Sequence, residues 1–150
     1  MPILARSSAA PPPWALYAAV LGGGMLGGST RYVIGLAIPA QPGQLPWAIL
    51  GINLAGALVL GALLGGWARR GHVTHPWRPF LATGLLGSFT TWSTFMADTL
   101  GLARAGRIGL ALAYLVGATA LGVVAAAAGW GLAQRAVPPA GTVVADGSRA

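Results

Sequence analysis

Four apolar stretches of membrane-spanning length constrain the fold of this chain more than any other feature. A helix needs about 20 apolar residues to cross the hydrocarbon core of a bilayer. Stretches of this length, separated by short connectors, cover residues 14–38, 47–68, 79–102 and 108–132. The composition agrees, because 55% of the residues are hydrophobic and only 7% are charged. The sequence therefore predicts an all-α membrane protein in which four transmembrane helices form a compact antiparallel bundle.

Apolar residues do not recur at regular spacing at the two ends of the chain. Residues 1–13 close with three consecutive prolines, and residues 137–150 contain two prolines together with Gly and Ser. We therefore expect disordered extensions at both ends and one transmembrane domain over residues 14–136. A cleaved signal peptide is not expected, because the proline run interrupts the order of basic and apolar regions that such a peptide needs.

The ionisable residues are few, and most of them are basic. The sequence has nine Arg, two Asp and two His, with no Lys, Glu or Cys. This inventory excludes thiol nucleophiles and disulfides, and it leaves little for acid–base or carboxylate–metal catalysis, so we expect no enzymatic activity. The Arg residues fall singly or in pairs between uncharged stretches. That pattern favours the loops of a membrane protein over a surface that binds nucleic acid.

The distribution of Arg also predicts an orientation. If both termini face the cytoplasm, six Arg lie on that side, whereas Arg104 and Arg107 lie on the other. Cytoplasmic loops carry an excess of positive charge, so this orientation is favoured. His72 and His75 share a cytoplasmic loop in this arrangement, but no acid or thiol lies nearby to complete a metal site. The six arginines are Arg6, Arg69, Arg70, Arg78, Arg135 and Arg149.

Residues 84–95 place five hydroxyls and three aromatic rings inside the third apolar stretch. Glycine and consecutive threonines lower helix propensity, so a local break is expected between Gly87 and Thr91. A break at membrane depth must line a cavity or bind an ion with its freed carbonyls. Trp92 and Phe95 share one face of the helix that follows. Their ring edges either contact an anion or pack inside the bundle.

Polar residues and glycines stand out in the other stretches. Asn53 either clamps a neighbouring helix or lines a pore. Arg31 snorkels to the membrane surface, attracts an anion or pairs with an acid. Asp98 either has a functional role or is simply hydrated or caps a helix end. Tyr114 is one of few polar groups in the fourth stretch. Glycine pairs at four-residue spacing predict close helix contacts. They include Gly23 with Gly27 and Gly61 with Gly65.

Three blocks of sequence point to one family. They are residues 24–32 (GMLGGSTRY), 51–56 (GINLAG) and 87–95 (GSFTTWSTF). Their order and spacing across four spans resemble the Fluc/CrcB family of fluoride channels. Several positions differ from the common pattern of that family. Ser88 replaces the second Gly of a pair, Trp92 stands where Phe is usual, and Asp98 stands where Glu is common. Ala118 and Gly122 stand where the fourth span often carries Ser or Thr.

The resemblance implies a dimer of two antiparallel four-helix subunits, with two narrow fluoride pores and a structural Na⁺ at the subunit interface. It places the Na⁺ at the backbone carbonyls of Gly87 and Thr90 from both subunits. Several weak donors would together replace the water of a small, strongly hydrated anion. The residues that the resemblance assigns to the fluoride path are Asn53, Trp92, Phe95, Thr94, Tyr114 and Arg31.

These features predict a multi-pass protein of the plasma (inner) membrane that lets fluoride leave the cytoplasm passively. Two other functions stay open. A proton-coupled small multidrug-type transporter would need a carboxylate in the first span, where this chain has Arg31. A non-conducting membrane assembly subunit would need the glycine faces but not the Thr-rich block. Because the Arg bias favours one orientation, the dimer partner is either a second copy or a paralogue of opposite orientation.

Overall fold

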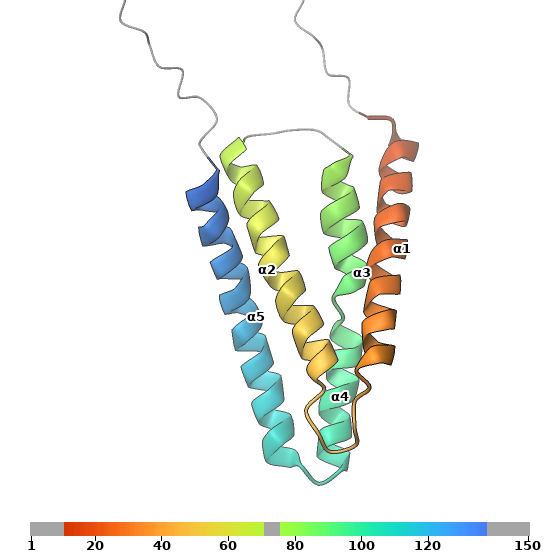
Figure 1. Ribbon diagram of the computed structural model, residues 1–150, viewed down its shortest axis with the longest axis vertical. Coiled ribbons are helices and arrows are strands. Elements are labelled where there is room, and N and C mark those ends of the chain that lie inside the picture. The colour runs from red at the N-terminus through yellow and green to blue at the C-terminus, as the bar shows by residue number, and fades with distance from the viewer. Residues whose placement is uncertain (1–10, 71–75, 138–150) are drawn as a thin grey trace, which may run out of the picture.

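The computed structural model describes residues 11–70 and 76–137, which fold into helices joined by short turns (Figure 1). Most of the two expected extensions, together with His72 and His75, lies outside the described residues. The described part of the chain is all-α, as the apolar stretches predict. In chain order the elements are α1 (Pro13–Ala37), α2 (Trp47–Arg70), the π-helix η1 (Pro79–Leu86), α3 (Gly87–Phe89), α4 (Trp92–Arg104) and α5 (Ile108–Ala136).

Proline and glycine set two of the helix ends. Pro13 begins α1, where its missing N–H costs no helical hydrogen bond. α4 ends at Arg104, and Gly106 just beyond it has a φ of 74°. The N–H of Arg107 donates to the carbonyl of Leu102 at 3.0 Å, and the N–H of Gly106 donates to the carbonyl of Ala103 at 3.0 Å. This Schellman turn lets the chain reverse into α5 within a few residues.

The helices pack as two pairs whose members are not consecutive in sequence. α2 runs along α5, and α1 runs along η1 and α3 (Figure 1). Glycines bring the paired backbones into contact, because a Cβ at Gly61 would collide with the backbone of α5 and a Cβ at Gly27 with the backbone of η1. The predicted contact faces at Gly23 and Gly27 and at Gly61 and Gly65 are thus confirmed.

The two pairs meet at one end of the molecule. They approach each other around α4, and they diverge toward the end where α1 begins and α5 ends (Figure 1). The compact bundle expected from the sequence is therefore divided into two pairs, because the glycine faces join α2 to α5 and α1 to the third span. A buried cluster at the α4 end comprises Ile49, Ile52, Phe95, Leu102, Ala111 and Tyr114.

Length, hydropathy and charge fit a membrane-spanning arrangement. Among the described residues, α2 and α5 are long and apolar enough to cross a membrane by themselves. α1 is of similar length, but its glycines and Arg31 make it less apolar, and the third span is divided between η1, α3 and α4. Four arginines stand at the end where α2 and α5 finish, and two stand at the opposite end (Figure 1). They are Arg69, Arg70, Arg78 and Arg135 at the first end, and Arg104 and Arg107 at the second.

Candidate functional site

The third span is interrupted between α3 and α4. Thr90 and Thr91 have extended backbone conformations, with φ and ψ of −75° and 155° at Thr90 and of −146° and 123° at Thr91. Thr91 caps α4, because its Oγ1 accepts a hydrogen bond from the N–H of Thr94 at 3.2 Å. The same hydroxyl donates to Oγ1 of Thr94 at 3.0 Å. The span thus passes from helix to extended chain and back to helix partway along its length.

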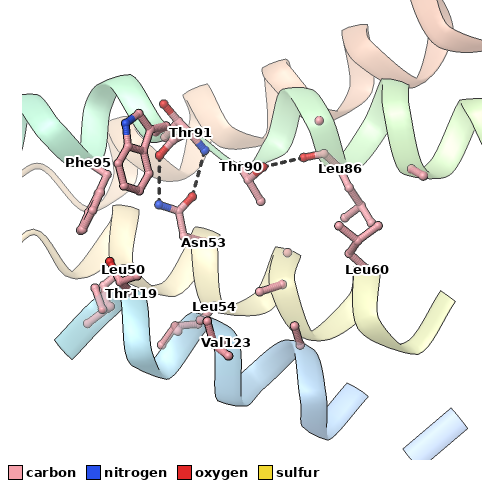
Figure 2. Close-up of a pocket in the computed structure, with 18 residues that line it drawn as sticks. Leu50, Asn53, Leu54, Leu60, Leu86, Thr90, Thr91, Phe95, Thr119 and Val123 are labelled. Carbon is pink, nitrogen blue, oxygen red and sulfur yellow. Dashed lines mark hydrogen bonds between the residues drawn. The ribbon is translucent and has the colours of Figure 1, made fainter. Parts of the chain in front are cut away.

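Asn53 of α2 holds this break by two hydrogen bonds. Its Oδ1 accepts from the N–H of Thr91 at 2.9 Å, and its Nδ2 donates to the carbonyl of Thr91 at 3.0 Å (Figure 2). The sequence left Asn53 open between a helix clamp and a pore residue, and the structure gives it the geometry of a clamp. A primary amide has two N–H groups, so one donor of Asn53 remains beyond this pair of bonds.

Arg31 reaches the break from α1. Its Nε donates to the carbonyl of Ser88 at 3.0 Å, and the side chain is partly buried there. The contact ties the first helix pair to the same segment that Asn53 ties to α2. Arg31 therefore contacts the protein interior instead of only snorkelling to the membrane surface.

Three aromatic rings form a continuous row beside the break. The ring centroids of Trp92 and Phe95 lie 5.3 Å apart at 52°, and those of Phe95 and Tyr114 lie 4.9 Å apart at 58°. Phe95 and Tyr114 are each 3% exposed, whereas Trp92 is 67% exposed. Tilted rings of this kind turn edges toward their neighbours. The row connects the surface of the subunit with its core.

Two buried polar atoms near this row have no hydrogen-bond partner among the described residues. They are Oη of Tyr114 and Oδ2 of Asp98. Asp98 lies one helical turn beyond Phe95 on α4. Buried polar atoms are almost always hydrogen-bonded in native proteins, so each exception needs an explanation.

A cavity of about 490 Å³ lies between α2, the broken third span and α5 (Figure 2). Most of its wall is aliphatic or glycine. Of the predicted site residues, Arg31, Thr94 and Tyr114 are not on this wall: Arg31 contacts the break at Ser88, Thr94 is bonded to the cap of α4, and Tyr114 packs behind Phe95. The polar and aromatic residues on the wall are Asn53, Thr90, Thr91, Trp92, Phe95 and Thr119.

The residues that could hold a metal here are backbone groups. Within the described ranges, His, Cys, Asp and Glu side chains form no group of three or more. Gly87 and Thr90, the predicted Na⁺ ligands, both line the cavity. Their carbonyls lose the donors that a continuous helix would give, since the N–H of Thr91 bonds to Asn53 and the N–H of Thr94 bonds to Thr91. Carbonyl oxygens freed in this way are suitable ligands for an alkali cation.

Sequence reasoning missed the part played by Thr91 and Gly56. Thr91 is both the cap of α4 and the partner of Asn53. Its signal is a threonine placed just before a new helix, with Thr94 three residues later. Gly56 lies against Thr90, so that a Cβ at Gly56 would collide with Cγ2 of the threonine. Its absent side chain lets the break approach α2, and one turn separates it from Asn53.

The fold and the site define an all-helical membrane protein with a broken span beside a mostly apolar cavity, on whose wall lie Trp92 and Phe95. A family model described as CrcB-like protein, Camphor Resistance (CrcB), matches residues 18–130. The chain belongs to this family, and it is a membrane protein.

Curated relatives match two thirds of the chain or more. The fluoride-specific ion channel FluC 2 of Nitrobacter hamburgensis is 39% identical over 119 residues, which is 79% of this chain and 96% of that protein. The fluoride-specific ion channel FluC of Methylobacterium nodulans is 41% identical over 101 residues, 67% of this chain and 82% of the relative. The fluoride-specific ion channel FluC 1 of Natronomonas pharaonis is 44% identical over 108 residues, which is 72% of this chain and 85% of that protein.

Proposed function

We propose that this chain forms a fluoride-selective channel through which fluoride leaves the cytoplasm passively across the plasma membrane. The observation that carries the proposal is the row of Trp92, Phe95 and Tyr114 beside the break, of which Trp92 and Phe95 share the cavity wall with Asn53. The description of the relatives as fluoride-specific ion channels supports it. Passive conduction through such a path requires no enzymatic step.

The residues of this path suit a small anion that is hard to dehydrate. The ring edges of Trp92 and Phe95 carry partial positive charge, and the indole of Trp92 adds an N–H donor. The second amide N–H of Asn53 and the hydroxyl of Tyr114 have no hydrogen-bond partner among the described residues. Each donor is weak, so fluoride exchanges water for several of them without being held too tightly to leave. Thr94 supports the path through Thr91, and the positive charge of Arg31 draws anions toward the break.

The proposal includes a structural Na⁺ at the carbonyls of Gly87 and Thr90, at the interface of an antiparallel dimer. The diverted N–H groups of Thr91 and Thr94 support this placement, because they leave both carbonyls without their helical donors. A bound Na⁺ would supply a fixed positive charge beside the anion path.

The dimer partner is either a second copy of this chain or a paralogue of opposite orientation. Apart from Arg31 inside α1, the described arginines are biased four to two toward the end where α2 and α5 finish, which favours one orientation in the membrane. Nitrobacter hamburgensis has both a FluC 1 and a FluC 2, so two relatives occur together in at least one organism.

Fluoride efflux from liposomes tests the proposed function. Vesicles containing the purified full-length chain and loaded with fluoride should release it quickly, as read by a fluoride electrode, whereas matched vesicles loaded with chloride should release little. Protein-free vesicles are the control for leakage. If the chain alone is silent and a paralogue restores release, the channel is a heterodimer. If both preparations are silent, the proposed function is wrong.

Replacing Tyr114 with phenylalanine separates transport from folding. Because Oη of Tyr114 has no partner among the described residues, its removal should change the free energy of unfolding by no more than about 1 kcal/mol. The same change should lower fluoride efflux several-fold, because one donor leaves the path. Tyr17→Phe, at a residue 70% exposed on α1, is the matched control and should change neither quantity. Wild-type efflux from Tyr114→Phe would remove Tyr114 from the path.

A further inference from the structure

We infer that Asn53 and Thr91 are positioning residues for the Na⁺ site, because they take up the two backbone N–H groups that would otherwise bond to the carbonyls of Gly87 and Thr90. The inference rests on the proposed function, of which the Na⁺ site is one part. It assigns Asn53 a task that is separate from its place on the wall of the fluoride path.

Asn53 frees the first carbonyl. In a continuous α-helix the N–H of Thr91 would donate to the carbonyl of Gly87, four residues earlier. In this structure the N–H of Thr91 donates to Oδ1 of Asn53 at 2.9 Å. The amide of Asn53 also donates to the carbonyl of Thr91 at 3.0 Å, so the residue is held at both of its backbone groups. A single side chain on α2 therefore keeps the helix from closing at this point.

Thr91 frees the second carbonyl. A continuous helix would direct the N–H of Thr94 to the carbonyl of Thr90. That N–H instead donates to Oγ1 of Thr91 at 3.2 Å. Because the cap uses the hydroxyl oxygen, serine could replace threonine here, whereas valine could not.

Two neighbouring carbonyls, those of Leu86 and Ser88, receive protein donors. The carbonyl of Leu86 accepts from the N–H of Thr90 at 3.0 Å and from Oγ1 of Thr90 at 2.9 Å. The carbonyl of Ser88 accepts from Nε of Arg31 at 3.0 Å. The network thus supplies donors to positions 86 and 88 and withdraws them from positions 87 and 90. The carbonyl oxygens at positions 87 and 90, without their helical donors, are suitable ligands for a hard cation, which prefers oxygen.

The approach of Asn53 to the break depends on Gly56. The methyl group of Thr90 occupies the place that a side chain at position 56 would need. α2 therefore lies close enough for the short Asn53 side chain to reach the backbone of Thr91. The positioning contact is built into the packing of α2 against the third span.

The test measures Na⁺ binding through stability. Purified full-length protein in detergent is unfolded by heat at increasing Na⁺, with N-methyl-D-glucamine chloride holding the ionic strength constant. The unfolding midpoint of the wild type should rise with Na⁺, since a ligand that binds the native state stabilises it. Asn53→Leu and Thr91→Val should each need at least about ten times the wild-type Na⁺ concentration to reach half of the full rise in the unfolding midpoint. Thr91→Ser should respond as the wild type does.

Gln134→Leu is the matched control. It removes a hydrogen bond between an amide side chain and a carbonyl of α2, from Nε2 of Gln134 to Gly65 at 3.2 Å, in a part of α5 away from the break. It should lower the midpoint at every Na⁺ concentration without changing the Na⁺ needed for half of the effect. If Asn53→Leu does not fold, the pair of Thr91 variants decides the question.

Two results would overturn the inference. One is a wild type whose unfolding midpoint does not change with Na⁺. The other is that Asn53→Leu and Thr91→Val reach half of the effect at the same Na⁺ concentration as the wild type. Fluoride efflux measured on the same preparations keeps this inference apart from the proposed function. Efflux without any response to Na⁺ defeats the inference and the proposed Na⁺ site, and it leaves the fluoride channel standing. A Na⁺ response that depends on Asn53 and Thr91, in a protein without efflux, supports the inference and defeats the proposed function.

Discussion

Replacing Gly129 with alanine should force α5 away from α2 and leave little folded protein. A Cβ at Gly129 would collide with the carbonyl oxygen of Leu58, and it would lie 2.9 Å from the nitrogen of Ala62. Both atoms belong to the backbone of α2, so no side-chain rotation relieves the overlap. Overpacking of this kind costs about 1–3 kcal/mol or more. Thermal unfolding and the monodisperse fraction in size-exclusion chromatography measure the loss.

Gly131→Ala supplies the control for this prediction. The substitution is the same and lies on the same helix two residues later, but a Cβ at Gly131 would meet no atom within 4 Å. Alanine should there raise the free energy of unfolding by up to about 1 kcal/mol, because it favours helix more than glycine does. Equal stability of the two variants would show that the close contact between α2 and α5 does not hold in the membrane protein.

Replacing Phe95 with leucine should lower fluoride efflux about tenfold or more while the protein remains folded. Phe95 is 3% exposed and sits between the rings of Trp92 and Tyr114. Leucine keeps much of its apolar volume but removes the ring edge that would face the anion. Loss of one contact to a charged group costs about 1.5–3 kcal/mol, which corresponds to a tenfold change or more. The measurement is efflux from liposomes, normalised to the amount of folded protein.

Phe80→Leu is the corresponding control, because it also removes one ring of a Trp–Phe pair. The rings of Trp77 and Phe80 lie 5.5 Å apart at the start of the third span, outside the cavity wall. The variant should keep wild-type efflux after normalisation. Equal losses in the two variants would mean that ring packing, and not an anion path, explains the effect at Phe95.

The positions of the helices could be predicted from the sequence, because the apolar stretches are long and their ends carry clear signals. The first expected span, 14–38, corresponds to α1 at Pro13–Ala37. The second, 47–68, corresponds to α2 at Trp47–Arg70. Low helix propensity at consecutive threonines indicated where the third span is weak, and Thr90 and Thr91 have extended backbones. These features depend on neighbouring residues alone.

The pairing of the helices and the contacts at the break could not be predicted in the same way. All four spans are apolar and carry glycine, so hydropathy does not say which face meets which. The bond between Asn53 and Thr91 joins residues 38 apart in sequence, and it depends on the register of α2 against the third span. The π-helical winding of η1 was likewise not expected. It shows in the N–H of Gly87, which donates to the carbonyl of Ala82, five residues earlier.

The pairing of alternate spans has a consequence for biosynthesis. α1 leaves the ribosome well before the segment that covers its glycine face, and α2 well before α5. After the first two spans have been inserted, the membrane therefore holds two helices, and the helix that each one packs against has not yet been synthesised. A nascent chain that stopped after α2 would have neither principal contact. Arrival of η1 and α3 completes the first pair, and arrival of α5 completes the second. The two principal contacts therefore join alternate spans, and neither of them lies within a hairpin of two consecutive spans.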